Sequence, residues 1–444
     1  MAHLLTSASR LTIILWFIIY TYDSFASLRR GASEEVQSRR SHRQTGFMYL
    51  ILINANLVIF MNYQDVSVLL LGLIEAVFLA VCLLIFKNAY SRGNKAIVNN
   101  MCMLLCISFI ILSRLDTGKA IRQLMIAIVA LVATALVPLF IDKIKIWNRL
   151  TWLYAVLGIA LLAVVAGAGS TVYGAKLNIT IGGITIQPSE FVKILFVFFA
   201  ASMLSQSVSF PRIVVTTIVA AIHVLILVAS RDLGGAGIFL ITYLVMLFVA
   251  TKKPGYLFAG IGLSVVAALI AYAVFPHVRT RVIAWENPLS VADGAGYQIC
   301  QSLFAIGTGG WLGSGLCEGM PDKIPVVESD FVFSAISEEL GGIFALCLIF
   351  VCLNCFLLFL NLSMEISDRF YKLIALGLGT VYGTQVFIMI GGVTKFIPST
   401  GVTLPLVSYG GSSLLATMIM FAIIQGLYVR SREEVYGGKK KEYR

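Results

Sequence analysis

Charge is the first thing this sequence lacks: charged residues make up 12% of its 444 positions and hydrophobic residues 59%. A water-soluble globular domain carries roughly 25% charged residues, so the composition excludes an ordinary soluble fold. The long apolar runs also lack the alternation of apolar and polar positions that a membrane β-barrel requires. We therefore expect a membrane protein built from helices.

Histidine is also scarce, and the glycine patterns that bind nucleotides are missing. The four histidines are scattered without metal-ligand spacing, so neither a zinc site nor a Ser–His–Asp triad is indicated. The glycines from Gly307 to Gly315 do not form a dinucleotide-binding fingerprint, because Leu312 stands at its third glycine position, and there is no P-loop. Any chemistry must then depend on carboxylates, on Lys or Arg, or on a loosely held divalent cation.

The eight cysteines exclude little. Most lie in apolar runs, where Cys352 and Cys355 are better explained by helix packing than by a metal site. Cys300 and Cys317 fall in a polar interval, where a disulfide could form but nothing in the sequence requires one.

What the sequence has instead is a series of apolar runs that can cross a bilayer core of about 30 Å. The first run, after Arg10, has no convincing signal-peptide cleavage site, so we expect it to be a retained helix. These runs predict an all-α polytopic membrane protein. Thirteen runs qualify: residues 9–27, 47–62, 66–87, 100–114, 121–141, 151–173, 188–205, 211–229, 233–251, 256–275, 331–361, 373–393 and 405–428.

The distribution of Lys and Arg predicts the orientation. If residues 28–46 are cytoplasmic, alternate connections place 22 of the 33 basic residues on that side, as the positive-inside rule expects. The N-terminus and the polar interval 276–330 then lie outside, and the C-terminus lies inside. Cytoplasmic loops thereby explain the net charge of +11, and we expect no nucleic-acid partner.

Residues 276–330 form the longest polar interval. It is too rich in apolar and aromatic side chains, such as Trp285 and Trp311, to be a disordered spacer, and long loops in compact folds usually carry function. We expect a folded cap that carries the chemistry. Three parts of the chain are expected around it: N-terminal membrane helices with a basic loop at 1–97, a membrane core at 98–430 and a basic cytoplasmic tail at 431–444.

A few polar positions at the ends of the apolar runs are informative. Glu190 and Lys193 are one helical turn apart and share a helix face. They could form a structural ion pair or line a substrate cavity, and the sequence favours neither. Pro188 and Asp232 stand where helices should begin, which suits proline in a first turn and an acidic cap.

Several sequence blocks occur in an order that is characteristic of one family. They are GA at 174–175, QPSEFVK at 187–193, DLGGA at 232–236, R-x-R at 279–281, DGAGYQ at 293–298, SLFAIGTGG at 302–310, DFVFSAISEELG at 330–341 and PSTGVTLPLVSYGGSS at 398–413. On these blocks, from about residue 98 to 430, the chain resembles the SEDS family of membrane proteins, the FtsW, RodA and SpoVE group. The resemblance implies a ten-helix core with a large extracytoplasmic loop between the seventh and eighth helices. About three extra helices then remain at the N-terminus.

The resemblance also implies an activity and partners. Proteins of this family polymerise lipid II, the undecaprenyl-pyrophosphate-linked disaccharide peptide, into glycan strands at the outer face of the bacterial plasma membrane. They are peptidoglycan glycosyltransferases that serve division, elongation or sporulation, among which the sequence does not choose. The implied partner is a class B penicillin-binding protein, a transpeptidase with one membrane span. Membrane lipids are the other expected partners. We expect the transpeptidase to dock through the helices near 331–393, where Gly341, Gly342 and Gly377 would allow close approach.

The same resemblance suggests site residues. Asp293 matches the family's essential external aspartate and is the expected general base, although Asp-Gly is also a common turn dipeptide. A divalent cation (Mg or Mn) or basic side chains would neutralise the departing pyrophosphate. The basic candidates are Arg279, Arg281 and Lys193, and the other candidates for substrate binding are Glu190, Tyr297, Gln298, Glu328, Asp330 and Ser408.

The chain departs from the family pattern at four places. Lys-Leu-Asn at 176–178 stands where Arg-Trp is common, so the cationic group there has shifted or been replaced. Val326 stands where a glutamate is usual, with Glu328 two positions later. Arg231 replaces a usual proline, and Thr400 stands where FtsW proteins often have lysine.

Two other functions remain open from the sequence. A flippase or transporter for the same lipid would also need a charged cavity between helices, but the inverted repeat typical of transporters is not visible. A non-catalytic scaffold for cell-wall enzymes is the second alternative.

Overall fold

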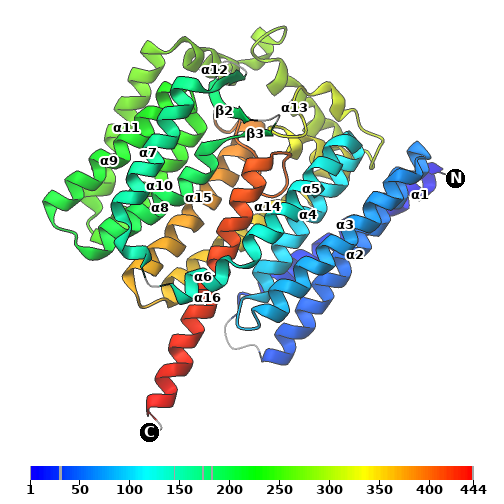
Figure 1. Ribbon diagram of the computed structural model, residues 1–444. Helices are drawn as coiled ribbons and strands as arrows, with labels where there is room; N and C mark the ends of the chain where they lie inside the picture. Colours follow the sequence, from blue (N-terminus) through cyan, green and yellow to red (C-terminus); the bar gives the residue numbers. More distant parts are fainter. Residues whose placement is uncertain (1, 30–32, 145, 173–174, 182–183, 443–444) are drawn as a thin grey trace.

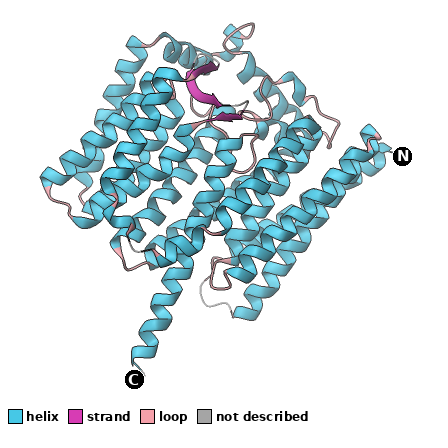
Figure 2. Ribbon diagram, in the orientation of Figure 1, coloured by secondary structure: helices cyan, strands magenta, loops and turns pink. Residues whose placement is uncertain are grey.

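A computed structural model describes residues 2–29, 33–144, 146–172, 175–181 and 184–442, with side chains omitted at 2–5, 170–176, 181–184 and 435–442. The chain folds as a bundle of long helices, with a small sheet and shorter helices at one end (Figures 1 and 2). The α-helices are α1 (Ala2–Ala26), α2 (Glu34–Tyr63), α3 (Val66–Leu84), α4 (Lys95–Leu115), α5 (Thr117–Ala135), α6 (Val137–Lys143), α7 (Thr151–Ala168), α8 (Pro188–Gln206), α9 (Phe210–Ala229), α10 (Leu233–Thr251), α11 (Pro254–Val274), α12 (Pro276–Glu286), α13 (Tyr297–Gly309), α14 (Val332–Glu365), α15 (Arg369–Val393) and α16 (Gly411–Glu442).

The predicted membrane spans correspond to these long helices. Within the described residues, twelve helical segments are long and apolar enough to cross a membrane. α1 is the thirteenth predicted span: its 25 residues reach about 37 Å at 1.5 Å per residue, but Arg10 and Asp23 lower its hydropathy. The all-α polytopic membrane fold is therefore confirmed.

The three N-terminal helices are built into the bundle. α2 and α3 contact α4, and α1 contacts α14 (Figure 1). Every residue from 97 to 114 of α4 is buried as a result. Polar contacts join the layers: the Tyr20 hydroxyl donates to Asn100 Oδ1 at 3.0 Å, and Asn100 Nδ2 donates to Asn354 Oδ1 at 2.8 Å. α11, which is described throughout, has no buried residue. On the flank of the bundle away from the N-terminal helices, no described helix of this chain therefore covers α11.

For two spans, one predicted boundary is wrong. The run 151–173 was expected to be helical throughout, but α7 ends at Ala168 and the chain continues into strands β1 (Ser170–Val172), β2 (Ala175–Ile181) and β3 (Ile184–Ile186). The strands pair antiparallel in the order β1-β2-β3, with Thr180 opposite Thr185, because their isoleucine and threonine residues favour extended backbone. The run 405–428 becomes helical only at Gly411.

α14 is broken near its start, at Gly341. Gly341 has φ 88° and ψ 165°, a conformation that only glycine adopts readily. The end of the large loop lies against this break: Gly342 N–H donates to Gly310 O at 2.8 Å, and Ser314 N–H donates to Glu338 O at 2.8 Å. An added Cβ at Gly341 would lie 2.3 Å from Gly313 N, so glycine is required here for close packing within this chain.

The interval 276–330 is a folded cap, as predicted. It contains α12, α13 and short 3₁₀ turns at Pro288–Val291 and Pro321–Lys323, and the Trp285 indole donates to Lys395 O at 3.1 Å. Arg10 near the start of α1 donates to Gly313 O at 2.7 Å, so the start of the chain lies at the cap end and the C-terminus lies at the opposite end (Figure 1). All eight cysteines lie in the described part and are free thiols.

Candidate functional site

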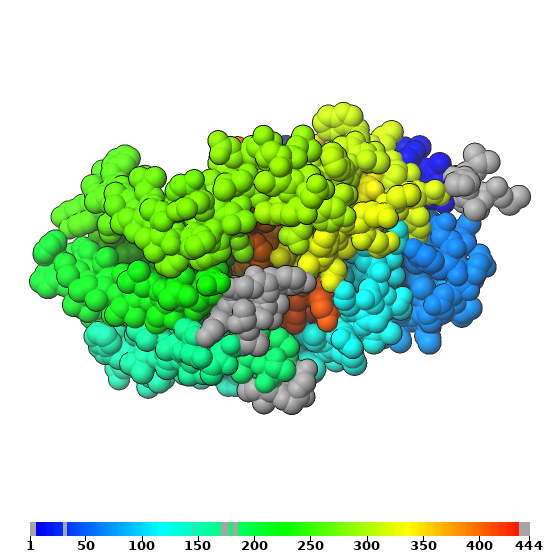
Figure 3. Space-filling view, turned by 90° about the horizontal axis from the view of Figure 1, so that it is seen from above, coloured from blue at the N-terminus to red at the C-terminus, as the bar shows by residue number. Residues whose placement is uncertain are grey.

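A small polar cavity lies at the cap end of the bundle. It has a volume of about 50 Å³ and is formed where α8 and α10 begin, beneath Arg281 of α12 and beside residues 400–403. All these segments come to one end because the connections alternate between the two ends of the bundle. From above, the orange segment before α16 is visible in a gap beside the yellow-green cap (Figure 3). The charged and polar residues on its wall are Gln187, Ser189, Glu190, Lys193, Arg231, Asp232, Arg281, Thr400 and Thr403.

Glu190 and Lys193 form an ion pair on the cavity wall. Lys193 Nζ lies 2.6 Å from Glu190 Oε2 and 2.7 Å from Gln385 Oε1, and only 3% of the Lys193 side chain is exposed. Pro188 occupies the first turn of α8, as predicted, and this start fixes the two charges one turn apart on the inner face. The sequence left open whether Glu190 and Lys193 form an ion pair or line a cavity. In the structure they do both.

Asp232 caps α10 and also faces the cavity. Its Oδ1 accepts from Gly235 N–H at 2.7 Å, and its Oδ2 accepts from the Ser189 hydroxyl at 3.4 Å. The predicted cap is thus confirmed. An added Cβ at Gly234 would lie 2.3 Å from Val402 Cγ2, so glycine allows the start of α10 to approach the 400–403 segment.

Arg281 is close enough to Asp232 and Asp330 to feel the charge of both carboxylates. Burial lowers the pKa of its guanidinium, while Asp232 and Asp330 act in the opposite direction. Burial raises the pKa of Asp232, and Arg281 is among the groups that offset this rise. Burial likewise raises the pKa of Asp330, whereas the hydrogen bond from Ser329 and the charge of Arg281 lower it. Arg281 Nη1 also donates to Ser399 O at 3.3 Å, which attaches α12 to the segment before α16.

The segment 400–403 closes the cavity on a third side. Gln385 Nε2 donates to Thr403 O at 3.1 Å, so the residue that contacts Lys193 also holds this segment. The Thr400 hydroxyl has no hydrogen-bond partner among the described residues. It is a free polar group at the cavity wall.

Other predicted site residues lie outside the cavity wall. Asp293 is exposed in the turn between the Pro288–Val291 3₁₀ turn and α13, and Tyr297 and Gln298 begin α13. Arg279 is exposed, and its Nη2 donates to Ala273 O at 3.0 Å. The structure therefore separates Arg279 from Arg281, because two residues along a helix turn a side chain to another face.

Glu328 and Ser408 are engaged in contacts within the protein. Glu328 Oε1 lies 2.5 Å from Lys119 Nζ of α5, and Tyr409 N–H donates to Glu328 O at 2.8 Å. The buried Ser408 hydroxyl accepts from Leu404 N–H at 2.9 Å and donates to Ser329 O at 2.5 Å. These contacts attach the end of the cap to α5 and to the segment before α16.

Several residues of the cavity wall or its support were missed as site candidates from sequence, among them Asp232, Gln385 and Thr400. Asp232 was assigned only a capping role, although an acidic residue ahead of an apolar run can serve a cavity as well. Gln385 could have been found as a polar residue in the middle of the run 373–393. Thr400 was noted only as a departure from the family pattern. Gly174 and the side chain of Lys176, where the family pattern changes, lie outside the described residues.

The residues present do not form a metal cage. Glu190 and Asp232 line the cavity, but Glu190 is paired with Lys193 and Asp232 with backbone and hydroxyl donors. Among the described residues, no three carboxylate, histidine or cysteine side chains gather as ligands. No step below is therefore assigned to a protein-held metal ion.

Comparison with known proteins places the chain in a family. The model of the FtsW/RodA/SpoVE family, described as cell cycle proteins, matches residues 94–433. The chain belongs to this family. The RodA peptidoglycan glycosyltransferase of Mycobacterium tuberculosis is 37% identical over 327 residues, which cover 69% of each chain. The stage V sporulation protein E of Bacillus subtilis is 33% identical over 315 residues, which cover 68% of this chain and 84% of that protein.

Solved structures of this family share the fold. One, reported as showing the structural coordination of polymerization and crosslinking by a peptidoglycan synthase complex, superposes with a TM-score of 0.64 at 24% identity, covering 77% of this chain and 98% of that chain. The crystal structure of Thermus thermophilus RodA superposes with a TM-score of 0.57 at 23% identity, covering 76% and 96%. α1 to α3 precede the part of the chain that the family model matches.

Proposed function

We propose that this FtsW/RodA/SpoVE protein polymerises lipid II into glycan strands, with Asp293 as the general base. The chain is a peptidoglycan glycosyltransferase, the activity for which its mycobacterial relatives are named. The observation that carries the proposal is the meeting of Glu190, Lys193, Asp232 and Arg281 in one cavity at the cap end. A membrane enzyme that handles a pyrophosphate-linked lipid needs such fixed charges near the membrane surface.

The reaction needs one base and a cationic site. The 4-hydroxyl of one sugar attacks the anomeric carbon of another; a new C–O bond forms, and the bond to undecaprenyl pyrophosphate breaks. The hydroxyl proton passes to the Asp293 carboxylate, and the electron pair leaves with the pyrophosphate. The pyrophosphate is a good leaving group that needs positive charge more than a proton, so one carboxylate suffices where a glycoside hydrolase uses two.

The size of the cavity decides where the sugars must lie. At about 50 Å³, it has room for a few waters only. A disaccharide does not fit inside. The sugars must therefore lie outside the cavity, against the cap that carries the exposed Asp293. In this arrangement Arg281, at the cavity wall, contacts the pyrophosphate, and Lys193 holds Glu190 and Gln385 in place.

Polymerisation by the isolated protein tests the proposal. The purified chain in detergent, without a membrane gradient, should convert lipid II into glycan strands that are resolved by length on a gel. Neither a lipid flippase nor a scaffold would make any glycan under these conditions. Absence of product from a folded, monodisperse preparation, with and without the transpeptidase partner, would reject the enzymatic assignment.

We further place the protein in the bacterial plasma membrane with the cap on the outer face. The basis is the concentration of basic residues at the opposite end, in the connections that carry Arg39, Arg92 and Arg212. In a Cys317→Ser background, an impermeant thiol reagent added to whole cells should label Asp322→Cys and spare Glu34→Cys. The reverse pattern would invert the orientation.

The partner surface predicted from sequence is wrong in its residues. Gly341 packs against Gly313 of the cap, Gly342 bonds to Gly310, and Gly377 faces Val197 and Met246 inside the bundle. These glycines serve packing within this chain, and Gly341 and Gly377 are buried in it. The same two helices, α14 and α15, do border an apolar groove with α10, lined in part by Ile349, Thr384 and Phe387.

We propose that the single span of a class B penicillin-binding protein lies in this groove, since small and apolar side chains allow close helix contact in a membrane. Ile349→Trp and Thr384→Trp should reduce co-purification of the tagged transpeptidase. Leu263→Trp on the bare helix α11 is the matched control and should leave recovery unchanged. Equal recovery of all three variants would place the partner elsewhere.

A further inference from the structure

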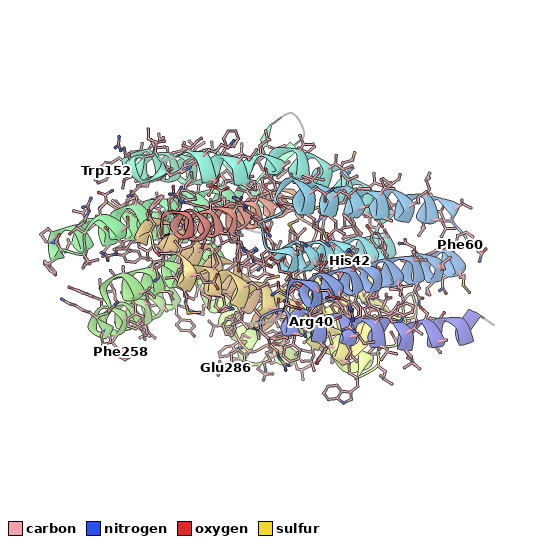
Figure 4. The ribbon with its side chains drawn as sticks, turned by 90° about the horizontal axis from the view of Figure 1, so that it is seen from below. Arg40, His42, Phe60, Trp152, Phe258 and Glu286 are labelled. Atoms are coloured by element: carbon pink, nitrogen blue, oxygen red, sulfur yellow. The ribbon has the colours of Figure 1, made fainter. Side chains whose placement is uncertain are left out.

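A second polar pocket lies at the end of the bundle opposite the cap. It has a volume of about 310 Å³, within the range of small-molecule sites. One wall comes from residues 27–29 and the start of α2, and the other from the start of α4 and the ends of α14 and α16. Figure 4 looks at the bundle from this end and labels Arg40 on α2. The pocket thus lies at the junction between the N-terminal helices and the core that the family model matches.

The pocket carries an excess of positive charge. Arg29, Arg40, Lys95 and Arg432 line it, against the carboxylates of Glu34 and Glu365. Arg29, Lys95 and Arg432 are exposed, whereas Arg40 donates to Ala26 O at 2.6 Å and fixes the end of α1. Cations from four separate segments therefore surround one space, where a bound anion would be attracted from several sides.

Two helices begin at the same pocket. α2 starts at Glu34 after the cap residue Ser33, and α4 starts at Lys95 after Asn94, whose Oδ1 accepts from Ala96 N–H at 2.9 Å. Helix N-termini carry partial positive charge and present backbone N–H groups, so they favour anions.

An unpartnered amide on the pocket wall points to a ligand. Gln44 is 1% exposed and lines the pocket. Its Oε1 accepts from Asn99 Nδ2 at 2.7 Å, but its Nε2 has no hydrogen-bond partner among the described residues. A buried N–H group without an acceptor is destabilising, and an anionic oxygen in the pocket would supply that acceptor.

We propose that this pocket binds a phosphate-bearing anion that joins the N-terminal helices to the core. Phosphate oxygens accept several charge-assisted hydrogen bonds at once, which matches converging Arg, Lys and amide donors. The phosphate comes either from the headgroup of an anionic lipid or from a soluble phosphate compound. A ligand in contact with Arg40 of α2 and with Lys95 and Arg432 of the core would oppose separation of α1 to α3 from α4 and α16.

Native mass spectrometry of the full chain in detergent tests the site with defined probes. The probes are phosphatidylglycerol, neutral phosphatidylcholine and inorganic phosphate. Retention of phosphatidylglycerol over phosphatidylcholine identifies a lipid headgroup, and retention of inorganic phosphate identifies a soluble phosphate. Equal binding of all three probes, or binding of none, overturns the proposal.

Variants show whether the bound phosphate occupies this pocket. The double variant Lys95→Gln/Arg432→Gln changes exposed side chains and should weaken binding about tenfold or more, since each hydrogen bond to a charged group is worth about one factor of ten. Gln44→Leu should weaken it by a similar factor. Arg39→Gln, next to Arg40 but exposed and paired with Glu35, should bind as the unmodified chain does. Equal loss in Arg39→Gln, or no loss in the double variant, would contradict the proposed site.

Discussion

The cavity and the surface of the cap each contain an aspartate that precedes a glycine-containing turn or helix start, and their settings differ. Asp232, in the cavity, is held by Gly235 N–H and the Ser189 hydroxyl, and burial raises its pKa. Asp293, on the cap, is exposed in a turn. A carboxylate already engaged by neighbouring donors is suited to positioning charge, whereas an exposed one is free to accept a proton from a sugar hydroxyl. We therefore propose that the enclosed site organises the leaving group and that the open site holds the base.

The largest expected effect shows whether Asp293 is the general base or only a turn residue. Asp293→Asn keeps size and turn preference but removes the proton acceptor, so the rate of lipid II polymerisation should fall about 100- to 10,000-fold. Expression and partner binding should be unchanged. The measurement is the initial rate of glycan formation by purified protein.

Asp322→Asn is the matched control for this substitution, because Asp322 is also an exposed aspartate of the cap. It should retain the normal rate. Near-normal polymerisation by Asp293→Asn would show that the comparison above is wrong, and it would direct the search for the base to Asp232 and Asp330.

The next effect concerns the stability of the cavity. Lys193→Met leaves the mostly buried Glu190 without its cation, and breaking a buried ion pair costs about 3–5 kcal/mol. Thermal unfolding in detergent should show a large drop for Lys193→Met and a smaller one for Lys193→Met/Glu190→Gln. Lys323→Met on the exposed cap is the control. A double variant as unstable as the single one would argue against an ion-pair role.

A smaller effect is expected from the carboxylate that caps α10. Asp232→Asn preserves the helix cap, since both residues serve that position, but it removes the charge beside Arg281. Polymerisation should fall about 10- to 100-fold, the worth of one or two charge-assisted contacts, with little change in melting temperature. A fall as large as that of Asp293→Asn would remove the distinction between the two aspartates.

The smallest effect is a pH dependence of stability. Burial raises the pKa of Asp330 in the folded chain above its ordinary value of 3.8, so the folded state binds this proton more tightly than the unfolded state. The contribution of Asp330 to the free energy of unfolding is therefore greatest below pH 3.8 and falls as pH rises through the raised pKa. The melting-temperature difference between the unmodified chain and Asp330→Asn should decrease over that interval and then stay constant. A difference that grows with pH would contradict the assigned direction.

The sequence predicted the helices better than their ends. Each of the thirteen apolar runs matched a helix, or in the case of 121–141 the two successive helices α5 and α6, because a bilayer demands long apolar segments whatever the fold. The end of α7 at Ala168 and the start of α16 at Gly411 were missed, since residues 170–172 and 405–410 are apolar enough to continue a helix. Hydropathy does not distinguish an apolar strand or turn from an apolar helix.

The site was predicted in part. The spacing of Glu190 and Lys193 correctly predicted a shared face, since one helical turn fixes that geometry. Arg279 and Arg281 could not be separated, because which face of α12 meets the cavity depends on its packing against distant segments such as Ser399. The small glycines of α14 and α15 were assigned to a partner, whereas their neighbours are in this chain.

The break in α14 joins part of the cap to a largely buried helix of the bundle. Ser314 and Gly315 N–H groups donate to Glu338 and Glu339 carbonyls of that helix, so they can open only when the helix end opens. Amide hydrogens at 314–315 should then exchange with solvent as slowly as those of α14, while those of the exposed turn residues Asp293 and Ala295 exchange faster. We thus expect the cap to have two kinetic regions. One would unfold with the bundle, and the other, around Asp293, would adjust to each incoming sugar without disturbing the membrane helices.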